Sequence, residues 1–142
     1  MRPALSIVTT LYHSAAHVEE FHRRMTTAAE GMAADHELIF VCDGSPDRSL
    51  EIAVDIASRD ARVMVVELAR NFGQHRAIMA GLRRARGELV FLIDCDLEEE
   101  PEWLNDFTAA LKAADADVVY GTQRSRRGSW FERVSGEFVY FG

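Results

Sequence analysis

The feature that most constrains the fold of this chain is a regular alternation of short apolar runs with segments of helical periodicity. The apolar runs are 5–11, 36–42, 63–68, 88–93 and 117–122, and the helical segments between them are 16–32, 49–58, 74–86 and 101–114. Short, continuous runs of apolar and β-branched residues are typical of strands buried on both faces. Their alternation with helices predicts an α/β domain with a mainly parallel sheet flanked by helices on both faces.

Length and composition are those of one globular domain. The 142 residues are enough for a single core, and 48% hydrophobic with 27% charged residues is an ordinary balance. We expect a ligand-binding domain over 1–123 and a basic, aromatic tail over 124–142. Because the chain stops on the apolar run 138–141 without a polar or turn signal, we expect it to be the N-terminal portion of a longer protein.

Charge and cysteine content narrow the class of protein. A net charge of -7 argues against a general nucleic-acid binder, because such proteins present a broad basic surface. Cys42 and Cys95 lack the paired spacing of a zinc site or a disulfide, which favours two buried thiols in a reducing cytoplasm. The apolar segment near the N-terminus is too short for a signal peptide or a membrane span.

Acidic residues follow the fourth predicted strand abruptly. Ligands of open parallel sheets bind beyond the carboxyl ends of the strands, where Asp94, Asp96 and Glu98 would lie. If the chain stays extended, alternation places Asp94 and Asp96 on one side, so that two carboxylates converge on Mg²⁺ or Mn²⁺. Such an ion would neutralise a diphosphate. The acidic residues next to Pro101 have a simpler explanation, since they would lie at a helix N-terminus.

Two further polar positions are candidates for ligand contact. Asp43 follows the second predicted strand and could accept hydrogen bonds from a nucleobase or ribose, or cap the next turn. Arg124, Arg126 and Arg127 form a basic island in an acidic chain. This island suits phosphate recognition through planar guanidinium groups, and the alternative is a solvated loop.

Four stretches of the chain carry a resemblance to a known family. They are 41–49 (Val-Cys-Asp-Gly-Ser-Pro-Asp-Arg-Ser), 70–73 (Arg-Asn-Phe-Gly), 80–87 (Ala-Gly-Leu-Arg-Arg-Ala-Arg-Gly) and 94–102 (Asp-Cys-Asp-Leu-Glu-Glu-Glu-Pro-Glu). In their order and spacing the chain resembles the family 2 glycosyltransferases, especially the branch that transfers sugars to polyprenyl or dolichyl phosphate. The resemblance covers nearly the whole chain.

The resemblance implies a GT-A, Rossmann-like fold and assigns roles to individual residues. The residues that it places around the nucleoside are Thr10, Leu11, Tyr12, Asp43 and Asp94. It places Asp94 and Asp96 at the metal and diphosphate as the catalytic pair, with Glu98 where the branch usually has a metal-binding Gln. Arg124 and Arg127 are the candidates for phosphate or acceptor contact. Departures from the family pattern at 9–14 and at Cys42 leave UDP and GDP both open.

The activity implied is inverting transfer of a sugar from a nucleoside-diphosphate sugar to an acceptor, with a polyprenyl phosphate lipid as the expected acceptor. The full-length protein would act at the cytoplasmic face of a membrane, and this portion alone would have little or no activity. In the tail, Trp130, Val134, Phe138 and Phe141 recur at helical spacing near arginines. This predicts a helix that rests on a membrane or packs in a core, and exposed aromatic residues there would favour homo-oligomers.

Competing functions are separable on sequence features. A nucleotidyltransferase also uses acids at strand ends, but it should carry an N-terminal glycine-rich loop, and 5–14 contains no glycine. The absence of Gly-x-Gly-x-x-Gly likewise disfavours a dinucleotide oxidoreductase. A glycosyltransferase-like module that binds nucleotide, or assists assembly, without turnover remains the alternative.

Overall fold

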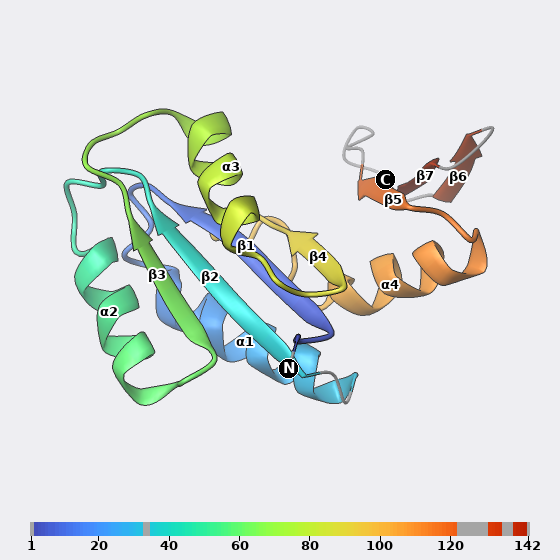
Figure 1. Cartoon of the computed structure of the whole chain (residues 1–142), viewed down its shortest axis with the longest axis horizontal. Helices are drawn as coiled ribbons and strands as arrows, with labels where there is room; N and C mark the ends of the chain where they lie inside the picture. Colours follow the sequence, from blue (N-terminus) through green and yellow to red (C-terminus); the bar gives the residue numbers. More distant parts are fainter. Residues whose placement is uncertain (1, 33–34, 122–130, 135–137, 142) are drawn as a thin grey trace. The chain divides into compact units, whose positions relative to one another are not determined.

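The computed structural model describes residues 2–32, 35–121, 131–134 and 138–141 (Figure 1). Two compact units make up the chain, Met1–Pro101 and Glu102–Gly142. The first is an α/β unit built on a parallel sheet, and the second combines one helix with a small separate sheet. The predicted division into domains 1–123 and 124–142 stays a prediction.

The first unit alternates strands and helices along the chain. In order, the elements are β1 (Leu5–Leu11), α1 (Val18–Gly31), β2 (His36–Cys42), α2 (Ser49–Arg59), β3 (Val63–Glu67), α3 (Gln74–Arg84) and β4 (Leu89–Leu92). The strands lie in the order β3-β2-β1-β4, and every pair is parallel. The chain builds outward from β1 to β3 and then returns to the other side of β1, so the strand order reverses between β1 and β4.

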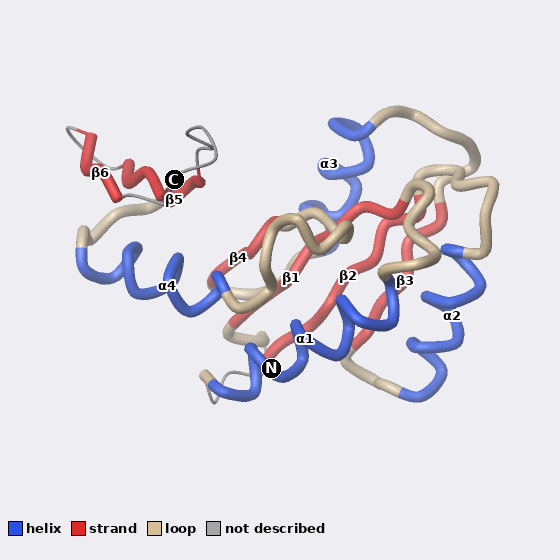
Figure 2. Tube along the Cα trace, turned by 180° about the vertical axis from the view of Figure 1, so that it is seen from behind, coloured by secondary structure: helices blue, strands red, loops and turns tan. Residues whose placement is uncertain are grey.

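Helices cover both faces of this sheet, as predicted. Figure 1 shows α3 in front of the sheet, and Figure 2 shows α1 and α2 on the opposite face. The central strands β1 and β2 are buried along almost their whole length, which explains their continuous apolar sequences. The α/β fold class is therefore confirmed.

Each covering helix meets the sheet through its apolar stripe. On α1, Phe21 and Met25 are fully buried, and the Phe21 ring lies 6.2 Å from that of Phe40 on β2. On α3, a Cβ at Gly81 would lie 2.5 Å from Cγ1 of Val8 and 2.9 Å from Cγ2 of Val41. Only a glycine therefore lets α3 approach this closely.

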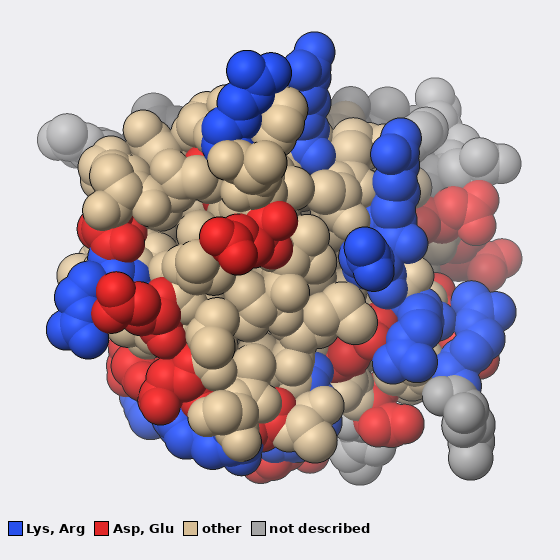
Figure 3. Space-filling model, turned by 60° about the vertical axis from the view of Figure 1, so that its left-hand side comes forward, with Lys and Arg blue, Asp and Glu red and all other residues tan. Residues whose placement is uncertain are grey.

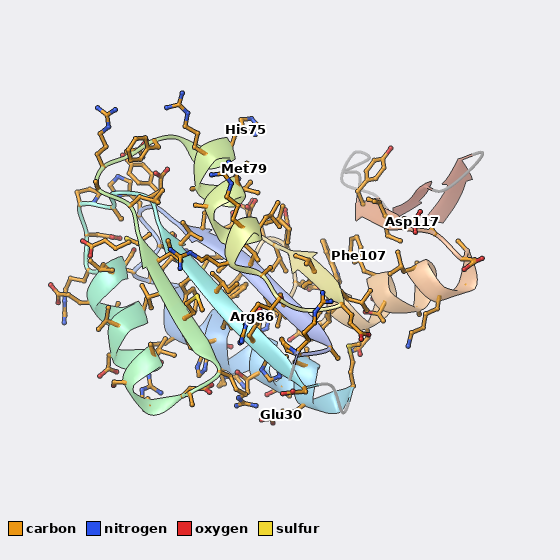
Figure 4. All side chains as sticks on the ribbon, in the orientation of Figure 1. Glu30, His75, Met79, Arg86, Phe107 and Asp117 are labelled. Carbon is orange, nitrogen blue, oxygen red and sulfur yellow. The ribbon has the colours of Figure 1, made fainter. Side chains whose placement is uncertain are left out.

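A buried carboxylate ties the amino ends of the strands together. Glu37 on β2 accepts hydrogen bonds from the Ser6 hydroxyl (2.7 Å), the Arg86 amide (2.8 Å) and the Arg86 guanidinium (3.0 Å). Burial alone would raise the pKa of Glu37, but these bonds outweigh it and lower the pKa. Figure 4 shows Arg86 at this end of the sheet. The connection from α3 to β4 is thereby fixed to β1 and β2.

The fourth strand differs from the sequence-based expectation of a fully buried strand. β4 pairs with β1 alone among the described strands, and Val90 and Leu92 are 47% and 45% exposed. An edge strand and a central strand can have the same apolar composition. The sequence therefore did not reveal that β4 has a described neighbour on one side only. The correction matters little for the site, because the chain still leaves the sheet next to β1.

The second unit contains α4 (Trp103–Ala113), β5 (Val118–Gly121), β6 (Phe131–Val134) and β7 (Phe138–Phe141). Its three strands lie in the order β5-β7-β6, with β5 and β7 parallel and β6 and β7 antiparallel. The expectation that the fifth strand joins the main sheet was wrong. Nor do the described tail residues form the predicted helix, since β-branched and aromatic residues suit short strands as well as a helix face.

None of the helices in the described ranges is both long enough and apolar enough to span a membrane.

Candidate active site

A cleft with a volume of about 340 Å³ lies at the carboxyl ends of the strands of the first unit. Its lining residues are Thr10, Tyr12, Ser14, Asp43, Asn71, Gly73, Gln74, Asp94, Cys95 and Asp96. They come from the carboxyl end of β1, the first residue of α3 and the segments that follow β1, β2, β3 and β4. The strand order reverses between β1 and β4, so the cleft lies at this reversal. This is where open parallel sheets bind their ligands. The structure therefore brings together five of the residues singled out from the sequence: Thr10, Tyr12, Asp43, Asp94 and Asp96.

The two aspartates reach the cleft by a turn, not by strand alternation. The Ile93 amide still bonds to the Val8 carbonyl, and the chain then turns at Cys95 and Asp96. Cys95 points inward and is only 3% exposed, while Asp96 is exposed. Burial, together with the two flanking carboxylates, raises the pKa of the Cys95 thiol to about 12. Cys95 is thus a packing residue between two acids, and Cys42 is also buried, as predicted for both thiols.

Asp94 is held by two neighbours. The Gln74 side-chain amide donates to Oδ1 of Asp94 (3.3 Å), and the Asp94 backbone amide donates to Oε2 of Glu99 (3.3 Å). Burial raises the pKa of Glu99, and the charges of Asp94 and Asp96 raise it further. Three carboxyl groups in one loop therefore repel one another, and a cation in the cleft would relieve that repulsion.

Glu98 does not join the two aspartates. Its side chain is exposed and does not line the cleft, and its backbone amide donates to Oδ1 of Asp96 (3.0 Å). Leu97 has a φ of 66°, which accompanies this tight turn. The predicted three-carboxylate set Asp94, Asp96 and Glu98 is thus not assembled, and within 2–32 and 35–121 no three potential metal-binding side chains meet.

The residues present still fit a divalent ion. Mg²⁺ is usually held by one or two carboxylates, and the phosphates of the substrate with water complete its coordination. Asp94 and Asp96 supply such a pair of hard oxygen donors at the wall of an open cleft. A site that is completed by a bound diphosphate needs no third carboxylate.

Asp43 follows β2, on the other side of β1 from Asp94. It lines the wall of the cleft there and links two loops. It is 3% exposed, and its Oδ1 accepts a hydrogen bond from the Phe72 amide (2.8 Å). Gly44 follows with a φ of 64°, and a Cβ there would lie 2.4 Å from the Asn71 amide nitrogen. The loops after β2 and β3 therefore pack backbone against backbone beside the cleft.

Asp47 organises this wall and received no role of its own from the sequence. Its carboxylate accepts hydrogen bonds from the Ser45 hydroxyl (2.5 Å), the Ser49 hydroxyl (2.6 Å) and the Ala15 amide (3.1 Å). Burial alone would raise the pKa of Asp47, but these bonds outweigh it and hold the pKa well below its usual range. The sequence signal that could have predicted this role is the Asp-x-Ser spacing at the start of a helix, since Asp and Ser commonly cap helices and turns.

The same loops position the segment after β1. The His13 amide donates to the Ser45 hydroxyl (2.8 Å), and the Ser14 amide donates to the Ser49 hydroxyl (3.0 Å). His13 has a φ of 53°, and its ring meets Tyr12 edge-on at 4.5 Å. Tyr12 is 50% exposed at the cleft, so an aromatic surface is available to a planar ligand.

The remaining predicted residues do not contribute side chains to the described cleft. Leu11 is fully buried, and its carbonyl accepts the Asp43 amide (3.0 Å), so it positions the wall through its backbone. Arg124 and Arg127 lie outside the described residues. Their predicted role in phosphate or acceptor contact stays a prediction.

Fold and cleft together define an α/β protein with an open cleft, lined by Asp43, Asp94 and Asp96, at the carboxyl edge of a parallel sheet. Over residues 6–141 the chain matches the glycosyl transferase family 2 model, and it belongs to that family. A Mycobacterium tuberculosis protein described as a glycosyltransferase is 48% identical over 136 residues, which cover 96% of this chain and 40% of that protein.

A second relative has a more specific name. The undecaprenyl-phosphate 4-deoxy-4-formamido-L-arabinose transferase of Edwardsiella ictaluri is 38% identical over 138 residues, which cover 95% of this chain and 42% of that protein. The chain thus spans about two fifths of the length of these curated relatives.

Solved structures share the fold. The mannosyltransferase PcManGT of Pyrobaculum calidifontis, in complex with GDP-Man and Mn²⁺, has a TM-score of 0.72 at 22% identity and matches 89% of this chain and 37% of its own. Residues 1–349 of S. aureus TarS in complex with UDP have a TM-score of 0.64 at 24% identity and match 90% and 38%. The GT-A fold expected from the sequence is confirmed.

Proposed function

We propose that this chain is the donor-binding part of a metal-dependent, inverting glycosyltransferase that moves a sugar from a nucleoside-diphosphate sugar to a polyprenyl phosphate at the cytoplasmic face of a membrane. The observation that carries the proposal is the convergence of Asp94 and Asp96 with Asp43 and Tyr12 in one cleft at the reversal of strand order. The cleft thus offers acidic side chains at one wall and an aromatic ring at another.

Donor recognition is divided between the two walls. Asp43 is buried and anchored through Oδ1, which leaves its carboxylate fixed to accept hydrogen bonds from a ribose or base. Tyr12 offers a ring face or edge in the same cleft, and Thr10 lines it too. The solved relatives with GDP-Man and with UDP support a nucleotide donor and leave the base open.

The diphosphate belongs at the acidic wall. Asp94 and Asp96 would hold Mg²⁺ or Mn²⁺, and Gln74 restricts the orientation of Asp94. When bound, such an ion stabilises the negative charge of the departing nucleoside diphosphate. The relative solved with Mn²⁺ supports a divalent ion without deciding between the two metals.

The acceptor proposal rests on chemistry and on one relative. In an inverting transfer, the acceptor oxygen attacks the anomeric carbon in line with the leaving diphosphate. A phosphate monoester oxygen is ionised near neutral pH, so this reaction needs no protein base, whereas a hydroxyl acceptor would. The name of the Edwardsiella ictaluri relative supports a polyprenyl phosphate.

The test is release of nucleoside diphosphate by full-length protein supplied with membranes, Mn²⁺ and candidate nucleotide sugars. We expect Asp96→Asn to reduce release by at least about a hundredfold, because it removes one of two charged oxygen donors to the metal. Asp106→Asn is the matched control, since Asp106 is an exposed carboxylate of α4 that does not line the cleft. Equal release by the two variants would contradict the proposal.

The second candidate is a family member that binds nucleotide without turnover. The departures at 9–14 and at Cys42 from the usual pattern favour it. Metal-dependent nucleotide binding with no release by full-length protein, with any donor tested, would establish this alternative.

A further inference from the structure

We propose that the outward face of α3 is a docking surface for an anionic phospholipid bilayer. The surface, called the α3 basic face below, consists of His75, Arg76, Met79 and Arg83, all of which are exposed. It lies in the first unit and uses residues to which the donor site gives no role.

Charge is concentrated in this part of the chain. Residues 68–87 contain five arginines and neither Asp nor Glu, although the whole chain has a net charge of -7. Two of the five arginines are engaged: Arg86 pairs with Glu37 (3.0 Å), and Arg70 lies over the Phe72 ring (4.8 Å). Arg76 and Arg83 belong to the α3 basic face, and Arg84 is the last residue of the helix. The described part of the chain offers none of these three an ion pair.

Helix geometry directs the side chains of the α3 basic face away from the sheet. Ala77 and Gly81 are the buried positions of α3. Residues at i, i+3 and i+7 share one side of a helix, so Arg76, Met79 and Arg83 lie together on the side opposite the buried stripe. Figure 4 shows His75 and Met79 projecting from α3. The face is thus formed by the rigid helix itself.

The chemistry of the face matches a lipid headgroup region. Met79 is 51% exposed between arginines, and an apolar group among cations suits the boundary of headgroups and acyl chains. A general nucleic-acid binder instead needs a broad basic tract. In Figure 3 the basic side chains lie along the top and the right of the view, with tan and red surface between several of them, and they do not cover the face as one broad tract.

The α3 basic face begins next to the cleft, which fits a role in holding the site at a membrane. Gly73 and Gln74 line the cleft, and α3 begins at Gln74. With 11 residues, α3 is about 16 Å long, so the basic face starts at the cleft and extends away from it. A bilayer held there would place lipid phosphates beside the donor site. The inference deepens the proposed function and rests on its lipid acceptor, but membrane binding can be measured without any transfer.

The experiment is sedimentation of full-length protein with two kinds of vesicle. One contains phosphatidylcholine alone, and the other contains three parts of phosphatidylcholine to one part of the anionic phosphatidylglycerol. The variant Arg76→Gln/Arg83→Gln removes two charges from the α3 basic face. Arg23→Gln/Arg48→Gln removes two exposed charges from outside α3, each next to an acidic side chain, and is the matched control. Thermal melts verify that both variants fold.

We expect binding to the anionic vesicles only, and a loss of about 30-fold in partition coefficient for Arg76→Gln/Arg83→Gln, because each arginine near an anionic bilayer contributes roughly fivefold. The partition coefficient of the control variant should stay within about twofold of that of the native chain, and binding should weaken as the salt concentration rises. The inference is overturned by equal losses in both variants, by no loss in either, or by binding to single-stranded RNA in preference to vesicles. Vesicle binding that persists without nucleoside diphosphate release would instead leave this surface intact and reject the transfer reaction.

Discussion

At the scale of single residues, Asp47 is the connection on which one wall of the cleft depends. Its carboxylate receives hydrogen bonds from Ser45 and Ser49, and these hydroxyls in turn accept the amides of His13 and Ser14. The loop after β2 therefore holds the loop after β1 in place. Since Tyr12 precedes these amides, its orientation depends on an acid that need not touch the nucleotide.

We expect Asp47→Asn to lower the free energy of unfolding by about 1–2 kcal/mol at neutral pH, because hydrogen bonds to a charged acceptor become neutral ones. Urea unfolding measures this change. Asp55→Asn is the control, since its pair with Arg59 on α2 is solvent-exposed and should contribute little to stability.

The same variant carries a pH signature. The pKa of Asp47 is lowered in the folded state, so its contribution is complete above the ordinary carboxyl range and is lost as the pH falls, when the unfolded chain takes up the proton first. The stability difference between the native chain and Asp47→Asn should therefore shrink between about pH 6 and pH 3. A difference that stays constant over this range would show that charge is not the cause.

At the scale of elements, the approach of α3 to the sheet sets the position of the β3–α3 loop. Gly81 meets Val8 and Val41 at distances that leave no space for a methyl group. The helix also begins at the cleft, where Gln74 contacts Asp94. A displacement of α3 would therefore move Gln74 and change the position of Asp94 in the cleft.

Gly81→Ala should destabilise the protein by about 1–3 kcal/mol through overpacking, despite the better helix propensity of alanine. Gly31→Ala is the matched control, because a Cβ there meets nothing within 4 Å. Gly81→Ala should cost less in a Val8→Ala background than in the native chain, because the shorter side chain makes room for the methyl group, and denaturant unfolding of both single variants and the double variant measures this difference. An equal cost in the two backgrounds would indicate that the methyl group clashes elsewhere.

Element types were more predictable than their arrangement. The spans of β1 and β2 were predicted to the residue, because continuous apolar runs bounded by turns leave little freedom. Periodicity is local, so it did not reveal that β4 is an edge strand or that β5 pairs with β7 in a second sheet. The aromatic tail satisfied a helical spacing by coincidence, and the described residues there form strands.

At the scale of the whole molecule, the strand order explains why acids distant in sequence share one cleft. Asp43 and Asp94 follow strands on either side of β1, so the reversal of order creates the crevice between them. The sequence located these residues by the rule for parallel sheets. Glu98 was included because it follows the same strand and occupies the position where the family branch usually has a metal-binding Gln, but the turn at Leu97 leaves its side chain outside the cleft.

The most direct test of the central claim is calorimetric titration of this chain with UDP and with GDP, in the presence and absence of Mn²⁺. If Asp94 and Asp96 hold an ion against a diphosphate, one nucleotide should bind weakly with Mn²⁺ and at least about tenfold more weakly without it or in Asp94→Asn/Asp96→Asn. Binding of neither nucleotide, or binding that is indifferent to both the ion and the two aspartates, would contradict the account.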